Sequence, residues 1–263
     1  MTLSVNSLTL NRGNAAVLRG ISAELQPGQI TAIVGPNGAG KSSLLMALAG
    51  LLAPETGTVT LDGRDITDIP LRARGQAIGY LPQGADIAWD VAVASLVMLG
   101  RMPHGDARRE PVDAAIAALD LEQLRRRPVS QLSGGERARV LLARVLAGEP
   151  RWILADEPLA ALDLAHQVNL AGHLKACAKA GAGVVIVLHD LALAMNYADR
   201  VIVLDAGTMA ADAPPEQSLS SENIERVWGV KTRWVQAEPN IEEKDANPKR
   251  NPGQHALVTF GPV

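Results

Sequence analysis

Alternating apolar and polar positions at the start of the chain predict a strand over residues 3–10, and residues 17–25 predict a second strand before a Pro27-Gly28 turn. Apolar runs rich in β-branched residues then recur along the chain, and such runs indicate buried strands. They lie at residues 29–34, 78–82, 152–155, 184–188 and 201–204, with a shorter candidate strand at 56–63.

Stretches with helical spacing separate these strands. Residues 43–49 follow the first buried strand, and residues 164–180 and 190–198 lie between the later ones. Strand–helix alternation predicts an α/β fold in which helices cover a parallel sheet. Residues 84–150 depart from this alternation, because they are rich in Ala, Leu and Arg. We interpret them as an inserted helical subdomain with candidate helices at 92–99, 112–119 and 133–146.

The composition changes again at residue 237. The segment that follows, up to Gly253, is charged and rich in Pro, Asn and Lys, which is typical of a flexible linker. Residues 256–260 are apolar enough to form one last strand. We therefore expect one domain over residues 1–236 and a linker-like tail over 237–263 that is dispensable for nucleotide binding.

Composition limits the possible functions. The chain has 263 residues, 47% of them hydrophobic, and a net charge of −3, so it is globular and has no electrostatic support for binding nucleic acid. Its one cysteine, Cys177, is expected to be a small core residue, and the absence of an intrachain disulfide suits the cytosol. We expect no signal peptide and no membrane span, so any work at a membrane would require a partner.

Residues 35–42 carry the strongest chemical signal. They fit the phosphate-binding pattern G-x-x-x-x-G-K-[ST], placed between an apolar strand and a helix, and a glycine-rich turn that matches by chance is the alternative. The loop N–H groups and the helix N-terminus would form a cradle for phosphate oxygens. Lys41 adds a cation for the β- and γ-phosphates, and Ser42 offers a hydroxyl to Mg²⁺. The predicted binding residues are Gly35, Pro36, Asn37, Gly38, Ala39, Gly40, Lys41, Ser42 and Ser43.

Two adjacent carboxylates, Asp156 and Glu157, end the apolar strand at 152–155. Charges near a core are costly unless they are compensated, and Mg²⁺ would compensate them. Asp156 would hold the metal through a water, while Glu157 would polarise the water that attacks the γ-phosphate. An ordinary pair of acids before Pro158 is the simpler interpretation. The motif gains its weight from the phosphate loop.

A second possible anion site lies at residues 132–136, which read Leu-Ser-Gly-Gly-Glu. Ser133 is a plausible N-cap for the helix that follows. Gly134 and Gly135 leave backbone N–H groups exposed at a helix N-terminus. Taken alone, a capped surface helix explains this stretch better.

In this order the motifs resemble the signature of the ATP-binding cassette (ABC) ATPases, over about residues 1–235. Gln83 is similar to the family's glutamine loop, Ala161-Leu162-Asp163 to its dimer-contact loop, and His189 to its switch histidine. For His189 alone, a histidine at a helix start would be the simpler interpretation. The resemblance implies a P-loop NTPase fold: a RecA-like core, an N-terminal antiparallel β subdomain and an inserted α-helical signature subdomain.

The resemblance also implies a head-to-tail homodimer that binds ATP with Mg²⁺. Each ATP would lie between the phosphate loop of one subunit and the Ser-Gly-Gly turn of the other. By position, the resemblance assigns phosphate binding to Lys41, Mg²⁺ binding to Ser42, Gln83 and Asp156, the catalytic base to Glu157, a γ-phosphate contact to His189, the link between the two sites to Asp163, and the turn facing the partner's ATP to Ser133, Gly134, Gly135 and Glu136.

Two departures from the family pattern stand out. The family usually places an aromatic residue upstream of the phosphate loop to stack on adenine, and residues 1–30 contain none. Arg12 falls at about that place, and a planar guanidinium can stack on a base. A solvated turn at Arg12 is the alternative, in which case Val17 would pack on the base. Leu159-Ala160 also lacks the hydroxyls often found there.

A finer resemblance indicates import. Residues 99–104, Leu-Gly-Arg-Met-Pro-His, look like a segment of importers for iron chelates, haem and cobalamin, and Trp228-Gly229-Val230 also resembles that group. A solvated helix end is the simpler interpretation of Arg101 and His104. The resemblance implies a separate membrane permease, an external substrate-binding protein, and a place at the cytoplasmic face of the inner membrane.

Other members of the family remain as alternatives: a molybdate importer, an exporter, or a soluble ATPase such as one for iron–sulfur assembly. We expect residues 84–105 to form the surface that contacts a permease, with Trp89 and Met98 as candidate apolar contacts. A core position is the alternative for Met98.

Overall fold

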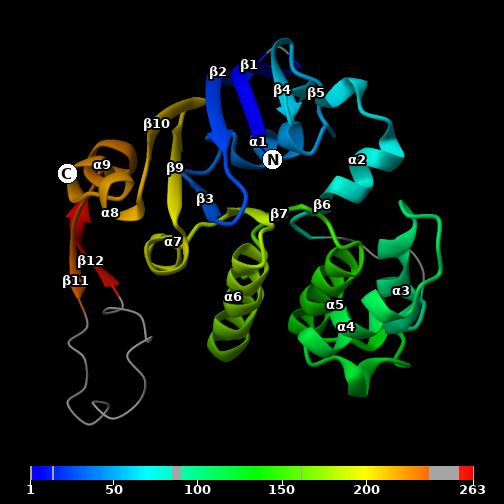
Figure 1. The fold of residues 1–263 in the computed structure, drawn as a ribbon. Helices are drawn as coiled ribbons and strands as arrows, with labels where there is room; N and C mark the ends of the chain where they lie inside the picture. The colour runs from blue at the N-terminus through cyan, green and yellow to red at the C-terminus, as the bar shows by residue number, and fades with distance from the viewer. Residues whose placement is uncertain (1, 14, 85–89, 161, 237–254, 263) are drawn as a thin grey trace.

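The computed structural model describes residues 2–13, 15–84, 90–160, 162–236 and 255–262 (Figure 1). A six-stranded sheet lies at its centre. Five of its strands run parallel, and β10 pairs antiparallel with β9 at one edge. The predicted parallel sheet is therefore confirmed. In sheet order the strands are β10 (Thr208–Ala213), β9 (Arg200–Asp205), β3 (Ile30–Val34), β8 (Gly183–Val187), β7 (Trp152–Asp156) and β6 (Ile78–Leu81).

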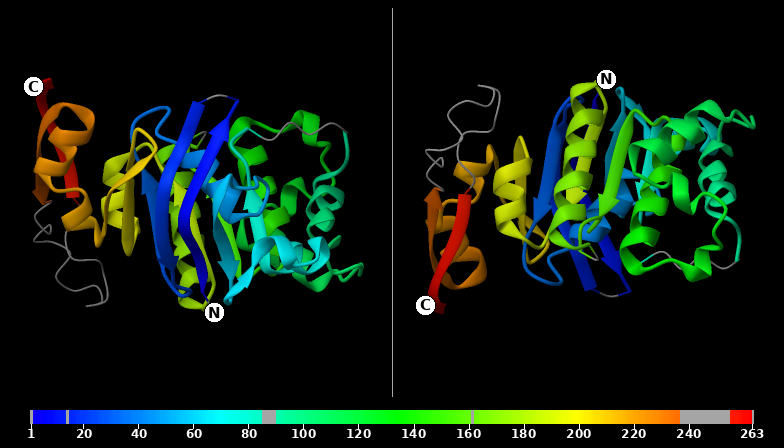
Figure 2. Two further views of the ribbon diagram at one scale, coloured as in Figure 1. Left: turned by 90° about the horizontal axis from the view of Figure 1, so that it is seen from above. Right: turned by 90° about the horizontal axis from the view of Figure 1, so that it is seen from below.

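The central strands are apolar throughout because each of their two faces covers a different core. Every residue of β3, β7 and β8 is buried. In β3, Ile33 joins the core that includes α1 (Lys41–Leu48), whereas Val34 joins the core that includes α6 (Leu164–Lys179). The two views of Figure 2 show these layers on opposite sides of the sheet.

An antiparallel sheet covers the α1 side of the central sheet and contains the strands predicted at 3–10 and 17–25 (Figures 1 and 2). Its order is β2 (Ala15–Leu25), β1 (Leu3–Arg12), β4 (Thr56–Leu61) and β5 (Arg64–Asp65). Leu3, Leu8 and Leu18 point from it into the core. This is the antiparallel β subdomain expected of a P-loop NTPase of this type.

Three helices gather beyond the β6 edge and form a helical subdomain (Figure 1). They are α3 (Val93–Met98), α4 (Glu110–Ala118) and α5 (Gly134–Ala147). Met98 packs against the core, which was the alternative considered for it. Short 3₁₀ turns complete this part and the loop before it: η1 (Ile66–Asp68), η2 (Leu99–Arg101), η3 (Glu122–Leu124) and η4 (Val129–Gln131).

Three described helices were not predicted: α2 (Leu71–Ala77), α8 (Pro215–Ser218) and α9 (Ser221–Trp228). The sequence of α2 is LRARGQA, and Ala77 is its one buried residue. An apolar periodicity was therefore absent from the sequence, and the helix depends on its neighbours, since so short a helix is marginal alone.

The chain ends in a small two-stranded sheet beside the α7 side of the core (Figure 1). Residues 256–260, the candidate last strand, lie within β12, which pairs antiparallel with β11. The candidate last strand is therefore present, and the segment interpreted as a linker, up to Gly253, lies outside the described residues. The remaining elements are α7 (Leu191–Tyr197), α8 (Pro215–Ser218), α9 (Ser221–Trp228), β11 (Val230–Gln236) and β12 (His255–Pro262).

Side-chain contacts hold β12 in place. Asn196 of α7 donates to the His255 carbonyl over 2.9 Å, and its own side-chain oxygen accepts from the His255 N–H at 2.8 Å. Leu257 and Trp234 pack against the core that contains α6. The described residues include no helix long and apolar enough to cross a membrane.

Candidate functional site

The candidate site lies at the carboxyl ends of four neighbouring strands, where ligands bind in open α/β sheets. The loop 35–42 follows β3, His189 follows β8, Asp156 and Glu157 end β7, and Gln83 follows β6. The fold therefore brings these predicted residues to one edge of the sheet, although they are far apart in the sequence.

In the phosphate loop, the backbone turns into α1 at Gly40, whose φ of +98° suits glycine. Lys41 is only 6% exposed, and its Nζ donates to the carbonyls of Gly35 at 2.8 Å and Pro36 at 2.9 Å. Burial lowers the pKa of Lys41, and the charges of Glu157 and Asp156 oppose that effect. The loop thus holds a desolvated cation that a phosphate can pair with in place of the two carbonyls.

Asp156 lies beside the phosphate loop. Its side chain is 4% exposed, and burial raises its pKa, opposed by a hydrogen bond from Ser42. Its Oδ1 is buried and has no hydrogen-bond partner among the described residues. A buried acceptor left unpaired is costly, so it marks a place for a ligand group or its water.

Glu157 is held by the residues that follow the two strands flanking β7. Its Oε2 accepts from Gln83 Nε2 at 2.7 Å, and its Oε1 pairs with His189 Nε2. Its backbone has φ of +51°, a left-handed conformation that is uncommon for a residue other than glycine. Such outliers persist only where the surroundings impose them, and they concentrate at functional sites.

The turn before α5 is a complete capping box. The Ser133 hydroxyl accepts from the Glu136 N–H at 3.2 Å, and the Glu136 carboxylate accepts from the Ser133 N–H at 2.8 Å. That hydrogen bond lowers the pKa of Glu136. The first N–H groups of a helix have no partner within it, so Gly134 and Gly135 are available to an anion.

A cavity of about 310 Å³ separates this turn from the carboxylates. It is lined by Gln83, Asp156 and Glu157 on one side and by Gly134 and Arg137 of α5 on the other. None of residues 35–42 lines it. The phosphate loop is therefore not part of the cavity beside this turn.

Arg137 was missed by the sequence reasoning. Its Nε is buried without a partner among the described residues, and it lines the cavity opposite Glu157. The sequence offered one signal for Arg137, which is its position directly after Glu136 in the predicted helix 133–146.

Asp163 caps α6, with its Oδ1 accepting from the His166 N–H at 2.9 Å and pairing with His166 Nδ1 at 2.7 Å. These hydrogen bonds lower the pKa of Asp163. Leu159 is buried, so its side chain belongs to the core. Ala161 lies outside the described residues.

The structure separates the two candidates for the adenine contact. Arg12 is exposed at the end of β1, where its backbone pairs with Ala15. Val17 lies at a bulge of β2, because the register passes from Leu18 to Ala16 against consecutive residues of β1. A Cβ on Gly40 would lie 2.8 Å from the Val17 carbonyl oxygen. Val17 is therefore directly beside the phosphate loop.

The residues present suit a hard cation such as Mg²⁺, which prefers oxygen ligands and keeps several waters. The described residues contain no group of three or more His, Cys, Asp or Glu placed to hold a metal by themselves. An ion here would depend on a hydroxyl, an amide oxygen and the phosphates. The hydrogen bond between Ser42 and Asp156 and the unpaired Asp156 Oδ1 fit such an arrangement.

Comparison with known proteins gives consistent matches. A family model described as ABC transporter matches residues 18–160. The chain is 44% identical over 236 residues to the hemin import ATP-binding protein HmuV of Pseudomonas entomophila (strain L48), covering 87% of this chain and 92% of that protein. It is 43% identical over 234 residues to HmuV of Rhodococcus jostii (strain RHA1), covering 87% and 80%.

Solved structures match as well. One is an inward-facing ABC transporter assigned to the metal-chelate type, with a TM-score of 0.82 and 26% identity, covering 99% of this chain and 98% of that one. Another is the dimeric post-hydrolysis state of the ATP-binding cassette MJ0796 bound to ADP and Pi, with a TM-score of 0.74 and 26% identity, covering 81% and 98%.

Proposed function

The chain belongs to the ABC transporter family of ATPases, and we propose that it hydrolyses ATP to energise the import of haem through a separate membrane permease. The observation that carries this proposal is the 44% identity, over 87% of the chain, to a hemin import ATP-binding protein. The Leu-Gly-Arg-Met-Pro-His segment at 99–104 supports the same group, in which iron chelates and cobalamin are the nearest alternative cargoes.

The residues of the site have distinct roles in binding ATP and Mg²⁺. Lys41 and the loop N–H groups bind the phosphates. Ser42 and Gln83 would hold Mg²⁺ bound with ATP, and Asp156 would hold one of its waters; the ion supplies charge that neutralises the transferring phosphoryl group.

Hydrolysis itself depends on two further side chains. The Glu157 carboxylate accepts a proton from the attacking water, for which it must exchange its contacts with Gln83 and His189. His189, freed from Glu157, then donates to the γ-phosphate. The side chain of His189 is 47% exposed, which leaves it room to turn.

A second copy of the chain completes each site. The cavity beside the Ser133 turn is not lined by the phosphate loop, and both the loop and the turn present backbone N–H groups suited to anions. A head-to-tail homodimer would place them on opposite sides of the same ATP, with Asp163 between the two sites. The similarity to a dimeric cassette supports this arrangement.

The permease contacts the helical subdomain next to Gln83, through residues of the range 84–105. Met102 is 71% exposed, and Leu71 of the neighbouring α2 is 76% exposed, so both offer apolar side chains to a partner. Trp89, the earlier candidate, lies outside the described residues. This contact would hold the chain at the cytoplasmic face of the inner membrane, next to a permease that receives haem from an external binding protein.

The test is reconstitution. The chain is co-purified with its permease and placed in proteoliposomes with the matching binding protein. We expect ATP-dependent uptake of haem and stimulation of ATP hydrolysis by haem-loaded binding protein. Uptake of cobalamin, a ferric chelate or molybdate instead of haem would identify that compound as the cargo. Full hydrolysis with no associated membrane protein would support a soluble ATPase instead.

A further inference from the structure

Arg101 is a buried cation outside the catalytic site. It is 2% exposed, although the sequence suggested a solvated helix end. Its Nε and Nη2 donate to the two carboxylate oxygens of Asp106 at 3.0 and 2.7 Å, and its Nη1 donates to the Ala147 carbonyl at 3.0 Å and to Glu149 at 2.8 Å. This forked geometry suits a guanidinium and not an ammonium.

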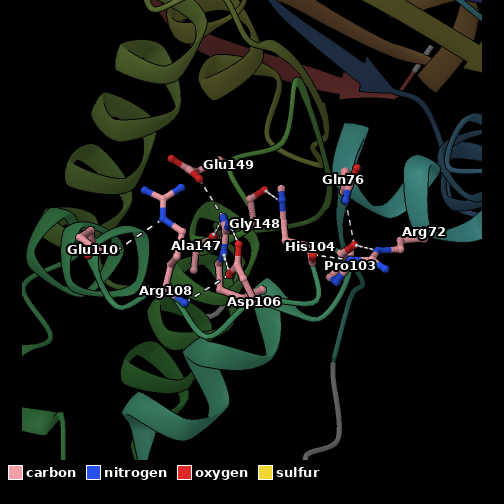
Figure 3. A network of polar contacts seen from close by, with 11 residues as sticks. Arg72, Gln76, Pro103, His104, Asp106, Arg108, Glu110, Ala147, Gly148 and Glu149 are labelled. Atoms are coloured by element: carbon pink, nitrogen blue, oxygen red, sulfur yellow. Dashed lines mark hydrogen bonds and ion pairs between the residues drawn. The ribbon is translucent and has the colours of Figure 1, made fainter.

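These contacts fasten the segment 99–106 to the end of α5, as Figure 3 shows. Ala147 is the last residue of α5, and His104 Nε2 adds a contact to the Gly148 carbonyl at 2.8 Å. Gly100 lies so close that a Cβ there would be 2.0 Å from the Arg144 carbonyl oxygen. The approach of the two segments is therefore close along several residues.

The other side of the same segment is fastened to α2. Arg72 donates through Nε to the Pro103 carbonyl at 2.8 Å and through Nη2 to the His104 carbonyl, and Gln76 donates to Pro103 at 2.9 Å (Figure 3). Since α2 leads directly into β6, the segment 99–106 joins the central sheet to the end of α5. We call this set of contacts the Arg101 clamp.

Stability alone is a weak explanation for the clamp. Burial of the guanidinium carries a desolvation cost, and its two carboxylate partners, Asp106 and Glu149, are 33% and 54% exposed, so solvent screens much of the attraction. Position is a better explanation, because α5 has 14 residues and is therefore about 20 Å long. A tilt of ~5° at its clamped end would move its first turn by about 2 Å at that length.

We propose that Arg101 is a positioning residue, whose clamp sets the pose of α5 and thereby the position of the Ser133 turn at its other end. This inference rests on the proposed pairing of that turn with the ATP of a second copy. Loss of the clamp should not change the affinity of the phosphate loop for nucleotide. It should weaken the ATP-dependent pairing of two chains.

The experiment separates these two kinds of binding. In the Glu157→Gln background, which should trap the ATP-bound dimer, dimerisation is measured by analytical ultracentrifugation with ATP and Mg²⁺, and ADP binding to the monomer by calorimetry. Coupling between sites typically changes affinity ~5- to 150-fold. We expect Arg101→Met to weaken the dimer about tenfold within that range, with ADP affinity unchanged. Arg101→Lys keeps the charge but lacks the planar fork, so its dimer affinity should lie between that of the Glu157→Gln background and that of Arg101→Met.

Two further variants keep the result interpretable. Arg125→Met removes an exposed ion pair with Asp113 in the same subdomain, and it should change neither measurement. Glu149→Gln removes one arm of the clamp at a half-exposed position, so it should fold even where Arg101→Met does not. It should weaken the dimer in the same direction, by less than Arg101→Met.

Equal dimerisation of the Arg101 and Glu149 variants and the background would overturn the inference. A parallel loss of ADP binding and dimerisation would also overturn it, because the clamp would then maintain the whole fold. If the background itself does not dimerise with ATP, the proposed dimer fails first, and the inference with it.

Discussion

Replacing Glu157 with glutamine separates the charge of one carboxylate from its shape. The side chain sits between Gln83 and His189 and is only 10% exposed, so it has little room to rearrange. A glutamine carbonyl can still accept from Gln83 Nε2. The substitution therefore leaves the cavity, the capping box of α5 and the phosphate loop unchanged, and it removes the ability to accept a proton.

The expected magnitude follows from that loss. General base catalysis typically contributes a factor of ~10²–10⁴ to a rate. At about 1.4 kcal/mol for each factor of ten, this raises the barrier by ~3–5 kcal/mol. Ground-state binding should change little, because Lys41 and the loop N–H groups are intact. The removal of one negative charge near Lys41 also reduces repulsion of the phosphates, so ATP affinity should hold or improve slightly.

The assay compares turnover and binding in one preparation. Phosphate release is followed at saturating ATP and Mg²⁺, and ATP affinity is measured by calorimetry on the same sample. We expect hydrolysis to fall by at least a hundredfold, with the dissociation constant within about threefold, which corresponds to less than 1 kcal/mol. Gel filtration with ATP should show a stable dimer for Glu157→Gln and none with ADP.

One result would refute the reasoning. If Glu157→Gln hydrolyses ATP at half the parent rate, then Glu157 is not the base. The matched control is Glu216→Gln, the same chemical change at an exposed carboxylate of α8. Its turnover with ATP should stay far closer to that of the parent.

Three other predictions concern the rest of the molecule. For the adenine contact, Val17→Ala or Arg12→Ala should raise the KM for ATP severalfold. A KM raised only in Val17→Ala would exclude Arg12 from the adenine contact, and a KM raised only in Arg12→Ala would exclude Val17. A chain ending at Gln236 should lose at least ~2 kcal/mol of unfolding free energy, because the two Asn196 hydrogen bonds alone are worth about 1 kcal/mol each and the β11–β12 pairing and the Leu257 contact are lost as well. An unchanged urea midpoint would contradict this prediction. The hydrogen bond from Arg101 holds the pKa of Asp106 at about 2, below the ordinary 3.8. The ionised Asp106 therefore stabilises the folded state above pH 3.8, and this stabilisation is lost as the pH falls through about 2. In Asp106→Asn, the urea midpoint of unfolding should depend less on pH over that window.

The sequence was sufficient for those parts of the site in which a local pattern carries the chemistry. The phosphate loop must link a strand to a helix, and residues 35–42 have β3 before them and α1 after them. Asp156 and Glu157 end an apolar strand, so their place at the sheet edge follows from the strand itself. The N-cap at Ser133 was likewise predicted from the local sequence, and the structure adds the reciprocal contact from Glu136.

The remaining parts depend on contacts between distant residues. Val17 reaches the phosphate loop through a bulge, and a bulge is fixed by strand register and not by the local pattern. β12 pairs with β11 across residues 237–254, whose composition indicated a linker. The simpler interpretation of Arg101 was a solvated helix end, whereas contacts between residues 99–106 and the end of α5 bury it.

The stretch from Gln83 to Arg101 contacts the rest of the molecule at both of its ends. Near its start, Gln83 donates to Glu157, the proposed base. Near its end, Arg101 is fastened to the end of α5, whose first turn is the proposed contact with a second copy's ATP. A permease that moves the exposed side of this stretch would therefore act on both at once. Chemistry and dimer closure would then respond together, because the same covalent segment carries both contacts.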